Sequence, residues 1–167
     1  MKALLERRSI RVFTPQPVPE DTVREIINAG MCAPSAGNEQ PWHFIVINER
    51  KILDEIPTFH KHAAMVKKAP VAILVCGDLE KEVHKGFWVQ DCSAAVENIL
   101  IAVAHHGLGA VWTGLYPRDD RVEGMRRLLG IPEHIVPFAL IPLGYSAAEK
   151  NRPVDRFDPS RIRYNKW

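Results

Sequence analysis

The sequence lacks the short motifs that mark several common protein classes. It has no C-x-x-C pair, no G-x-G-x-x-G after a strand, no P-loop and no serine in a nucleophile-elbow context. These absences argue against a zinc knuckle, a dithiol redox centre, a nicotinamide-binding Rossmann fold and a classical hydrolase. Internal repeats and low-complexity segments are also absent.

Net charge and cysteine are scarce as well. The formal net charge is only +2, and the three cysteines, Cys32, Cys76 and Cys92, are widely spaced. Near neutrality argues against a nucleic-acid footprint. An odd number of distant thiols predicts free cysteines in a reducing cytoplasm. We expect buried thiols, although Cys32 adjoins a polar loop and a reactive role there is the alternative.

Metal-ligand spacing is also missing. The histidines are scattered, and the one H-x-H pair, His60 and His62, has no patterned carboxylates nearby. A protein metal site needs convergent ligands at a recognisable spacing. No metal is therefore predicted.

The length and apolar content predict one soluble domain. The chain has 167 residues, 46% of them hydrophobic, and its first residues do not read as a secretory leader. Hydrophobic periodicity and turn residues divide it into alternating elements. Helices are predicted over 2–7, 19–30, 49–68 (broken near Pro57), 87–106 and 119–129, and strands over 43–48, 70–78, 107–114 and 135–143.

Three of these elements receive a more specific prediction. The strand 43–48 is apolar on both faces, which favours a central position in a sheet. The strand 135–143 carries Pro137 and Pro142 near its ends, which favours bends or an edge position. The helix 87–106 is apolar nearly all round, and its polar residues favour a buried core helix, possible at a subunit contact, over a membrane span.

Two polar segments are candidates for binding. Arg7-Arg8-Ser9-Ile10-Arg11 places guanidinium groups and a hydroxyl together, which suits an anion such as phosphate. The segment 33–44, APSAGNEQPWHF, is a proline-bracketed loop rich in hydrogen-bond donors. The alternatives are a solvated charged turn for the first and a plain helix-to-strand connection for the second.

The C-terminal segment 145–167 lacks apolar periodicity. It alternates basic and aromatic residues, so we expect it to form an extended arm that docks on the body or on a second subunit. Single-stranded nucleic acid is a weaker alternative, disfavoured by the low net charge. The residues concerned are Arg152, Arg156, Arg161, Arg163, Phe157, Tyr164 and Trp167.

Taken together, these segments resemble the nitroreductase family of FMN-dependent oxidoreductases. The resemblance rests on the arginine motif 7–11, the loop 33–44, GLGAVWTG at 107–114, LGIP at 129–132, and the RFD and RYNKW pieces of the arm. It implies a single α+β domain with a mainly antiparallel four- to five-stranded sheet sandwiched by helices. It also implies an intertwined homodimer with FMN at the subunit interface.

The resemblance further implies a role for individual residues. Arg7 and Ser9 correspond to phosphate ligands, Arg8 lies in the same motif, and Arg11 corresponds to a contact with the pyrimidine edge of the flavin. Thr113 and Gly114 correspond to the backbone beside flavin N5. The arm contributes Arg156, together with Arg152, to the phosphate. Loop residues Pro34, Ser35, Ala36 and Asn38 correspond to contacts from the other subunit.

The implied activity is a ping-pong oxidoreductase. NADH or NADPH reduces FMN and leaves, and a small-molecule acceptor such as a nitroaromatic or quinone then takes the hydride. No catalytic side chain is predicted, because the flavin carries the chemistry. The alternatives are reductive dehalogenation, flavin cleavage, or a flavin-binding module without turnover. Neither nucleic acid nor a membrane is an expected partner.

Overall fold

The computed structural model describes residues 1–148 and 155–167. Five strands form one antiparallel sheet in the order β1-β2-β5-β3, with β4 also paired to β5. The strands are β1 (Trp42–Ile47), β2 (Val71–Asp78), β3 (Gly109–Ala110), β4 (Thr113–Gly114) and β5 (Ile135–Gly144). The prediction of an α+β fold with a mainly antiparallel sheet of four to five strands is confirmed.

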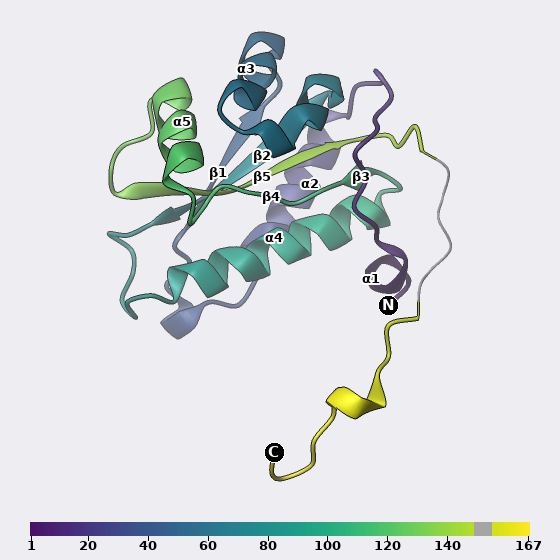
Figure 1. Cartoon of the computed structure of the whole chain (residues 1–167), viewed down its shortest axis with the longest axis vertical. Helices are drawn as coiled ribbons and strands as arrows, with labels where there is room; N and C mark the ends of the chain where they lie inside the picture. The colour runs from purple at the N-terminus through teal and green to yellow at the C-terminus, as the bar shows by residue number, and fades with distance from the viewer. Residues whose placement is uncertain (149–154) are drawn as a thin grey trace.

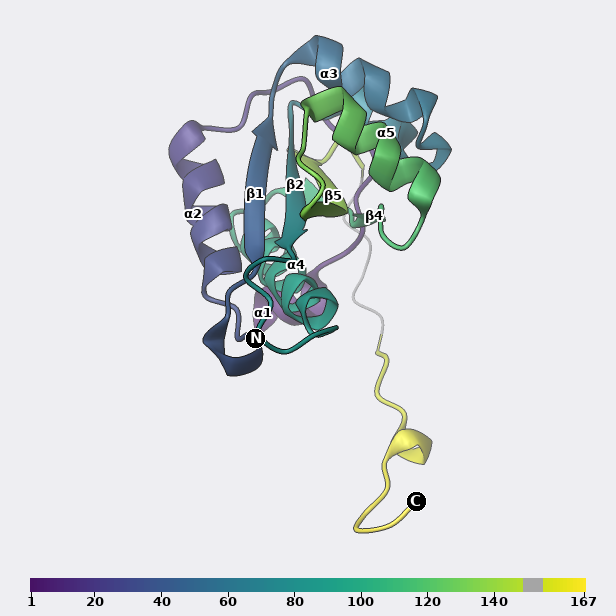
Figure 2. The same ribbon diagram turned by 90° about the vertical axis from the view of Figure 1, so that its left-hand side faces the viewer.

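Helices cover both faces of the sheet (Figure 1 and Figure 2). One face carries α2 (Glu20–Met31) and α4 (Trp88–His105), with α1 (Lys2–Glu6) packed against α4. The other face carries α3 (Arg50–Glu55), α5 (Asp119–Leu129) and two short 3-10 helices, η2 (Ile56–Thr58) and η3 (Lys61–Lys68). Two more 3-10 turns are η1 (Ala36–Asn38) and η4 (Pro159–Arg161).

The core forms two layers because neighbouring residues in a strand point to opposite faces. Along β2, Val71, Ile73 and Val75 pack with α2 and α4, whereas Ala72 and Leu74 pack with α3, η3 and α5. All eight residues of β2 are buried. A strand that is apolar throughout its length is therefore covered by helices on both sides.

One predicted strand position is wrong. The strand predicted to be central, β1, lies at one edge of the sheet, and β5 lies inside the sheet between β2 and the short strands. Only Trp42 and Ile47 of β1 are buried, and Val46 is 44% exposed, so the apolar pattern of β1 does not mark a central strand. Pro137 of β5 sits where the pairing with β2 shifts register between Val75 and Cys76, so the predicted bend is present without an edge.

Other elements differ in detail. The predicted strand 107–114 is two short strands, because the pairing with β5 is interrupted at Val111 and Trp112. Asp119 is the first residue of α5 and does not cap it, and Arg118 takes the cap position without a side-chain bond. Gly130 ends that helix in the left-handed conformation, as its position predicted.

The cysteines are free, and only two are buried. Cys76 and Cys92 are fully buried, and burial raises the pKa of both thiols, to about 12 for Cys76. Such thiols stay protonated and unreactive. Cys32 is exposed at the end of α2, so the prediction that it is buried is wrong.

Candidate functional site

The arginine motif runs beside β3 rather than lying free in solvent. Ser9 forms a parallel bridge with Ala110, and the Ile10 amide donates to the Ala110 carbonyl at 2.8 Å. Gly109 has no room for a side chain, since a Cβ there would lie 2.7 Å from Ile10 Cβ. This close approach fixes the motif against the segment that leads to β4.

The arginines of the motif are held differently. Arg7 Nε lies 3.3 Å from Glu97 Oε1 in α4, yet this nitrogen is buried without a hydrogen-bond partner among the described residues. Arg8 donates to the carbonyls of Leu5 and Arg7 at 3.2 and 2.7 Å. Arg11 is exposed. Arg7 therefore keeps an unused donor, which suits an anionic ligand.

The short strand β4 has an open side. Thr113 is buried and donates its hydroxyl to the Leu140 carbonyl at 2.7 Å. A Cβ built on Gly114 would meet only the Tyr116 carbonyl oxygen, at 4.0 Å. Arg121 of α5 donates to the Gly114 carbonyl at 2.9 Å. The backbone here is fixed, and a flat group can approach it closely.

The loop 33–44 is tied down by hydrogen bonds of its own. Ser35 Oγ accepts from the Gln40 amide, and Gln40 Nε2 donates to Asn38 Oδ1, both at 3.0 Å. Gly37, Asn38 and Gln40 all have positive φ, at 53°, 58° and 47°. This conformation is strained for residues other than glycine, so the hydrogen bonds must hold it.

Two acidic side chains attach the loop to the rest of the chain. Asp91, in the first turn of α4, accepts from the Ala36 amide at 3.0 Å. Glu39 accepts from the amides of Val83 and His84 at 2.7 and 2.9 Å. The loop is therefore anchored near the start of α4, whereas Arg7 contacts the same helix further along, at Glu97.

Of the two aromatic residues at the start of α4, one is packed in the core and the other is exposed. Trp88 is buried and lies edge-on to Tyr116 and Phe138, at centroid distances of 4.8 and 5.9 Å. Phe87 is 46% exposed. Trp88 is therefore a packing residue, whereas the Phe87 ring is open to solvent.

The arm lies apart from the body in Figure 1, with Arg156 and its aromatic residues exposed. Arg163 stacks over the Trp167 ring at 5.5 Å. The predicted phosphate contact of Arg152 falls outside the described residues. Nothing in residues 155–167 is buried against the body of the same chain.

One cluster of possible metal ligands lies at the far end of β2. Asp78, Glu80 and His134 place ligand atoms within 4.8 Å of one another. Asp78 Oδ2 pairs with His43 Nε2 at 3.0 Å, and Asp78 Oδ1 accepts from the Glu80 amide at 3.0 Å. Burial works to raise the pKa of Asp78, but these hydrogen bonds outweigh it and lower the pKa. The carboxylate is thus satisfied by protein groups.

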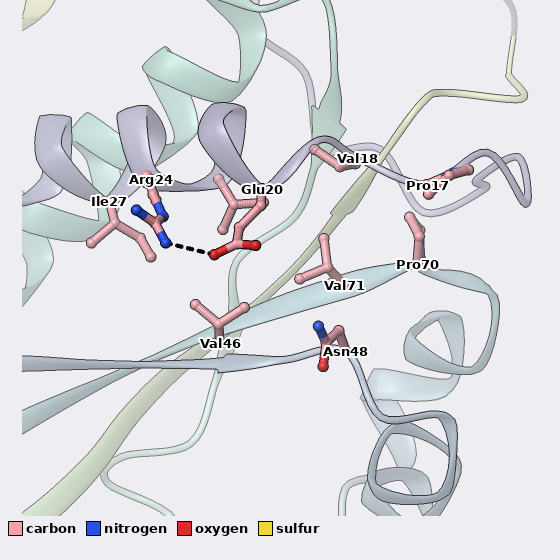
Figure 3. Close-up of a pocket in the computed structure, with 10 residues that line it drawn as sticks. Pro17, Val18, Glu20, Arg24, Ile27, Val46, Asn48, Pro70 and Val71 are labelled. Carbon is pink, nitrogen blue, oxygen red and sulfur yellow. Dashed lines mark hydrogen bonds and ion pairs between the residues drawn. The ribbon is translucent and has the colours of Figure 1, made fainter.

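A groove of about 510 Å³ lies between α2 and the edge strand β1 (Figure 3). Its charged residues, Glu20 and Arg24, pair with each other at 2.7 Å. Val46 of β1 and Ile27 of α2 give it an apolar floor and wall. It lies away from the arginine motif, so it adds nothing to an anion site.

Sequence reasoning missed three polar residues near these segments. Asp91 served only as one of the polar residues that argue against a membrane-spanning helix. A buried acid in an apolar helix usually has a hydrogen-bond partner, and this was the available signal. Arg121 and His60 approach Gly114 from α5 and from the turn before η3. Their sequence neighbourhoods carry no motif.

The whole chain has close relatives. It is 56% identical over 167 residues, all of this chain and 87% of the other, to a provisionally named NADH dehydrogenase/NAD(P)H nitroreductase from Methanothermobacter thermautotrophicus. The sequence model described as Nitroreductase family matches residues 4–145. The chain belongs to the nitroreductase family.

Solved structures of nitroreductase-like proteins agree in fold. A provisionally named NADH oxidase from Clostridium acetobutylicum aligns with a TM-score of 0.95 at 40% identity, over 99% of each chain. A provisionally named nitroreductase from Desulfovibrio desulfuricans, in complex with FMN, aligns with a TM-score of 0.83 at 30% identity, over 99% of this chain and 96% of that one.

Relatives with a different printed activity also match. Rat iodotyrosine deiodinase 1 is 30% identical over 85% of this chain, which spans 60% of the deiodinase. Within the nitroreductase family, the sequence of this chain is thus similar to proteins named for more than one reaction. Among the helices of the described residues, none is long and apolar enough to cross a membrane.

Proposed function

We propose that this chain is an FMN-dependent NAD(P)H oxidoreductase that works as a homodimer. It takes a hydride from NADH or NADPH and passes it to a small acceptor, such as a nitroaromatic or a quinone, in a ping-pong cycle. Family membership and the FMN-bound relative support the cofactor. The names NADH dehydrogenase/NAD(P)H nitroreductase and NADH oxidase, carried by two similar proteins, support the reaction class.

The observation that carries the proposal is the contact between the arginine motif and β3. Ser9 and Ile10 lie against Ala110 of β3, and β4 with the open side of Gly114 follows β3 directly along the chain. The buried Arg7 Nε, 3.3 Å from Glu97 Oε1, has no hydrogen bond among the described residues and would donate to an anion that enters there. A phosphate joined to a flat ring system suits this combination of charge and open backbone.

In this proposal the arginines recognise both ends of the cofactor. Arg7 and Ser9 hold the phosphate, supported by Arg156 and Arg152 from the arm. Arg8 lies in the same motif. Arg11 faces the pyrimidine edge, where a cation stabilises the negative charge that accompanies reduction. FMN supplies the hydride chemistry, so no acid, base or nucleophile from the chain is required.

The glycine strand and the loop orient the ring in this proposal. Thr113 and Gly114 lie beside N5, and the bonds from Thr113 to Leu140 and from Arg121 to Gly114 keep that backbone rigid. Pro34, Ser35, Ala36 and Asn38 act on the FMN of the other subunit. Subunit pairing is supported by the distal part of the arm, where Phe157, Tyr164 and Trp167 are exposed.

A second reaction is favoured by one specific observation. The deiodinase relatives support reductive dehalogenation of a halogenated aromatic at the same flavin. That reading keeps the cofactor and the interface and changes only the acceptor. A flavin-binding module without turnover would share only the bound FMN with the main proposal.

Anaerobic reduction tests the proposal directly. Purified protein is loaded with FMN, mixed with NADH or NADPH, and followed by loss of flavin absorbance. Nitroaromatics, quinones and halogenated phenols are then added one at a time to the reduced protein. A compound that accepts the hydride restores the flavin absorbance. Failure to bind FMN overturns the proposal, and binding without bleaching by either nicotinamide favours the binding module.

A further inference from the structure

Two buried carboxyl oxygens meet at the base of the loop 33–44. Glu39 Oε1 and Asp91 Oδ2 are both buried, and neither has a donor among the described residues. The other oxygen of each group is already used: Asp91 Oδ1 accepts from the Ala36 amide, and Glu39 Oε2 accepts from the amides of Val83 and His84.

Each carboxyl group shifts the pKa of the other, which places the two unpartnered oxygens near enough for a hydrogen bond between them. Ionised carboxylates only accept, so such a bond requires one proton between them. Burial of Asp91 and the proximity of Glu39 raise the pKa of Asp91, against the Ala36 amide. The His84 and Val83 amides and the bond to Asp91 lower the pKa of Glu39, against burial. These directions make Asp91 the more basic of the two groups, so a shared proton would reside on it.

We propose that Glu39 and Asp91 share one proton, and that this proton holds the loop 33–44 on α4 in the conformation that binds FMN. The inference rests on the proposed function for the role of the loop. It makes both acids positioning residues, since they act on the cofactor through the loop backbone.

The loop needs such a restraint. Asn38 and Gln40 adopt positive φ at 58° and 47°, and they flank Glu39 on either side. Ala36, whose amide bonds to Asp91, begins the same turn. If Asp91 loses its proton, two buried negative charges face each other and the bond that closes the turn is lost. The loop then relaxes away from α4.

The sign of the pH effect follows from these shifts. A raised pKa of Asp91 in the closed state means that closure is favoured at low pH and weakens as pH rises through that pKa. The lowered pKa of Glu39 acts oppositely only below its usual range near 4.5. Two further titratable groups face the pair: Glu82, which raises the pKa of Asp91, and His84, which stabilises the Glu39 anion.

The test replaces each acid by its amide, because the amide NH2 group can donate the hydrogen bond at every pH. FMN dissociation constants are measured for the wild type, Asp91→Asn and Glu39→Gln between pH 5 and 9. The ratio of wild-type to Asp91→Asn dissociation constants should grow with pH, approaching about tenfold for each unit of pKa difference between the closed and open loop. Ionisation of the FMN phosphate is common to all variants and cancels in the ratio.

Glu82→Gln is the matched control, since it removes a nearby charge and leaves the pair intact. It should retain the wild-type decline in FMN affinity and shift it to lower pH, because the Glu82 charge raises the pKa of Asp91. Glu39→Gln should lose the decline as Asp91→Asn does, which guards against a folding defect in either variant. Parallel pH profiles for the wild type and both amide variants would overturn the proposal.

A second readout needs no cofactor. In FMN-free protein, the melting temperature of Asp91→Asn minus that of the wild type should increase with pH, because only the wild type gains a buried charge pair. A flat difference would contradict the shared proton. If this difference increases while no variant binds FMN at any pH, the shared proton stands and the proposed function fails.

Discussion

The two halves of the candidate site are built in different ways. The loop 33–44 satisfies its polar groups internally and through Asp91 and Glu39. The arginine motif is held by its backbone at Ala110, by the bonds from Arg8 to the Leu5 and Arg7 carbonyls and by the Arg7–Glu97 ion pair. Arg7 Nε is buried without a hydrogen bond among the described residues. The loop is thus shaped by its own chain, whereas Arg7 keeps a donor for a ligand.

This difference separates stability from binding. Strain in the loop is offset by folded-state hydrogen bonds, so a substitution there should weaken both the fold and FMN binding. A substitution in the motif should weaken FMN binding alone, because the side chains contribute little to the core. Four variants break or sharpen this contrast.

The largest effect is expected for Arg7→Ala. Loss of a charge-assisted phosphate contact is worth roughly 1.5–3 kcal/mol, or about ten- to a hundredfold in FMN affinity. The melting temperature of FMN-free protein should stay close to that of the wild type, since the Glu97 pair is partly exposed. Titration of FMN by fluorescence quenching checks this. Unchanged affinity would remove Arg7 from the site.

Gly37→Ala should affect both properties. Gly37 has φ of 53°, and a Cβ there would lie 2.6 Å from His84 Nε2. We expect a loss of about 1–3 kcal/mol in unfolding free energy, with weaker FMN binding. Gly86→Ala is the control, because Gly86 also has positive φ, at 90°, but meets nothing within 4 Å. Equal losses in the two variants would exclude the contact with His84 as the cause.

His60 tests the structure beneath the site. Burial, together with the Arg121 cation, lowers the pKa of His60 to about 4. The unfolded state therefore takes up a proton more readily, and stability is lost as pH falls from about 6.5 toward 4, by at most about 1.4 kcal/mol per pH unit. Urea unfolding at each pH should show this loss in the wild type and not in His60→Phe. The exposed neighbour His62→Gln should behave as the wild type.

The smallest effect is expected for Glu97→Gln. Glu97 Oε1 lies 3.3 Å from Arg7 Nε and competes with an anion for it. Removing the carboxylate charge should strengthen FMN binding by about two- to fivefold, the range of a partly exposed ion pair. A weaker affinity in this variant would mean that Glu97 positions Arg7 instead of competing for it.

The sequence predicted most elements because their signals are local. The buried helix α4, the strand β2 and the left-handed Gly130 follow from periodicity and from a glycine stop. The order of strands could not be read in the same way. An apolar strand is equally compatible with an edge position, as β1 shows, and a proline with a register shift inside the sheet, as Pro137 shows.

The same distinction between local signals and contacts made by the fold applies to the candidate site. The motif 7–11 and the loop were visible as unusual compositions, and their assigned contacts remain predictions. Asp91 and Arg121 could not be assigned, because their roles depend on contacts with residues 55 and 7 positions away that only the fold creates. Single polar residues in an apolar helix are the one signal that pointed to such a contact.

Subunit complementation tests the central claim most directly, that each FMN is held by the arginine motif of one chain and the loop of the other. Arg7→Ala and Gly37→Ala chains carrying different tags are co-expressed, and the mixed dimer is isolated and titrated with FMN. A shared site predicts that the mixed dimer regains one tight FMN site, although both parent dimers lack one. A mixed dimer that binds FMN no better than its parents would contradict the claim.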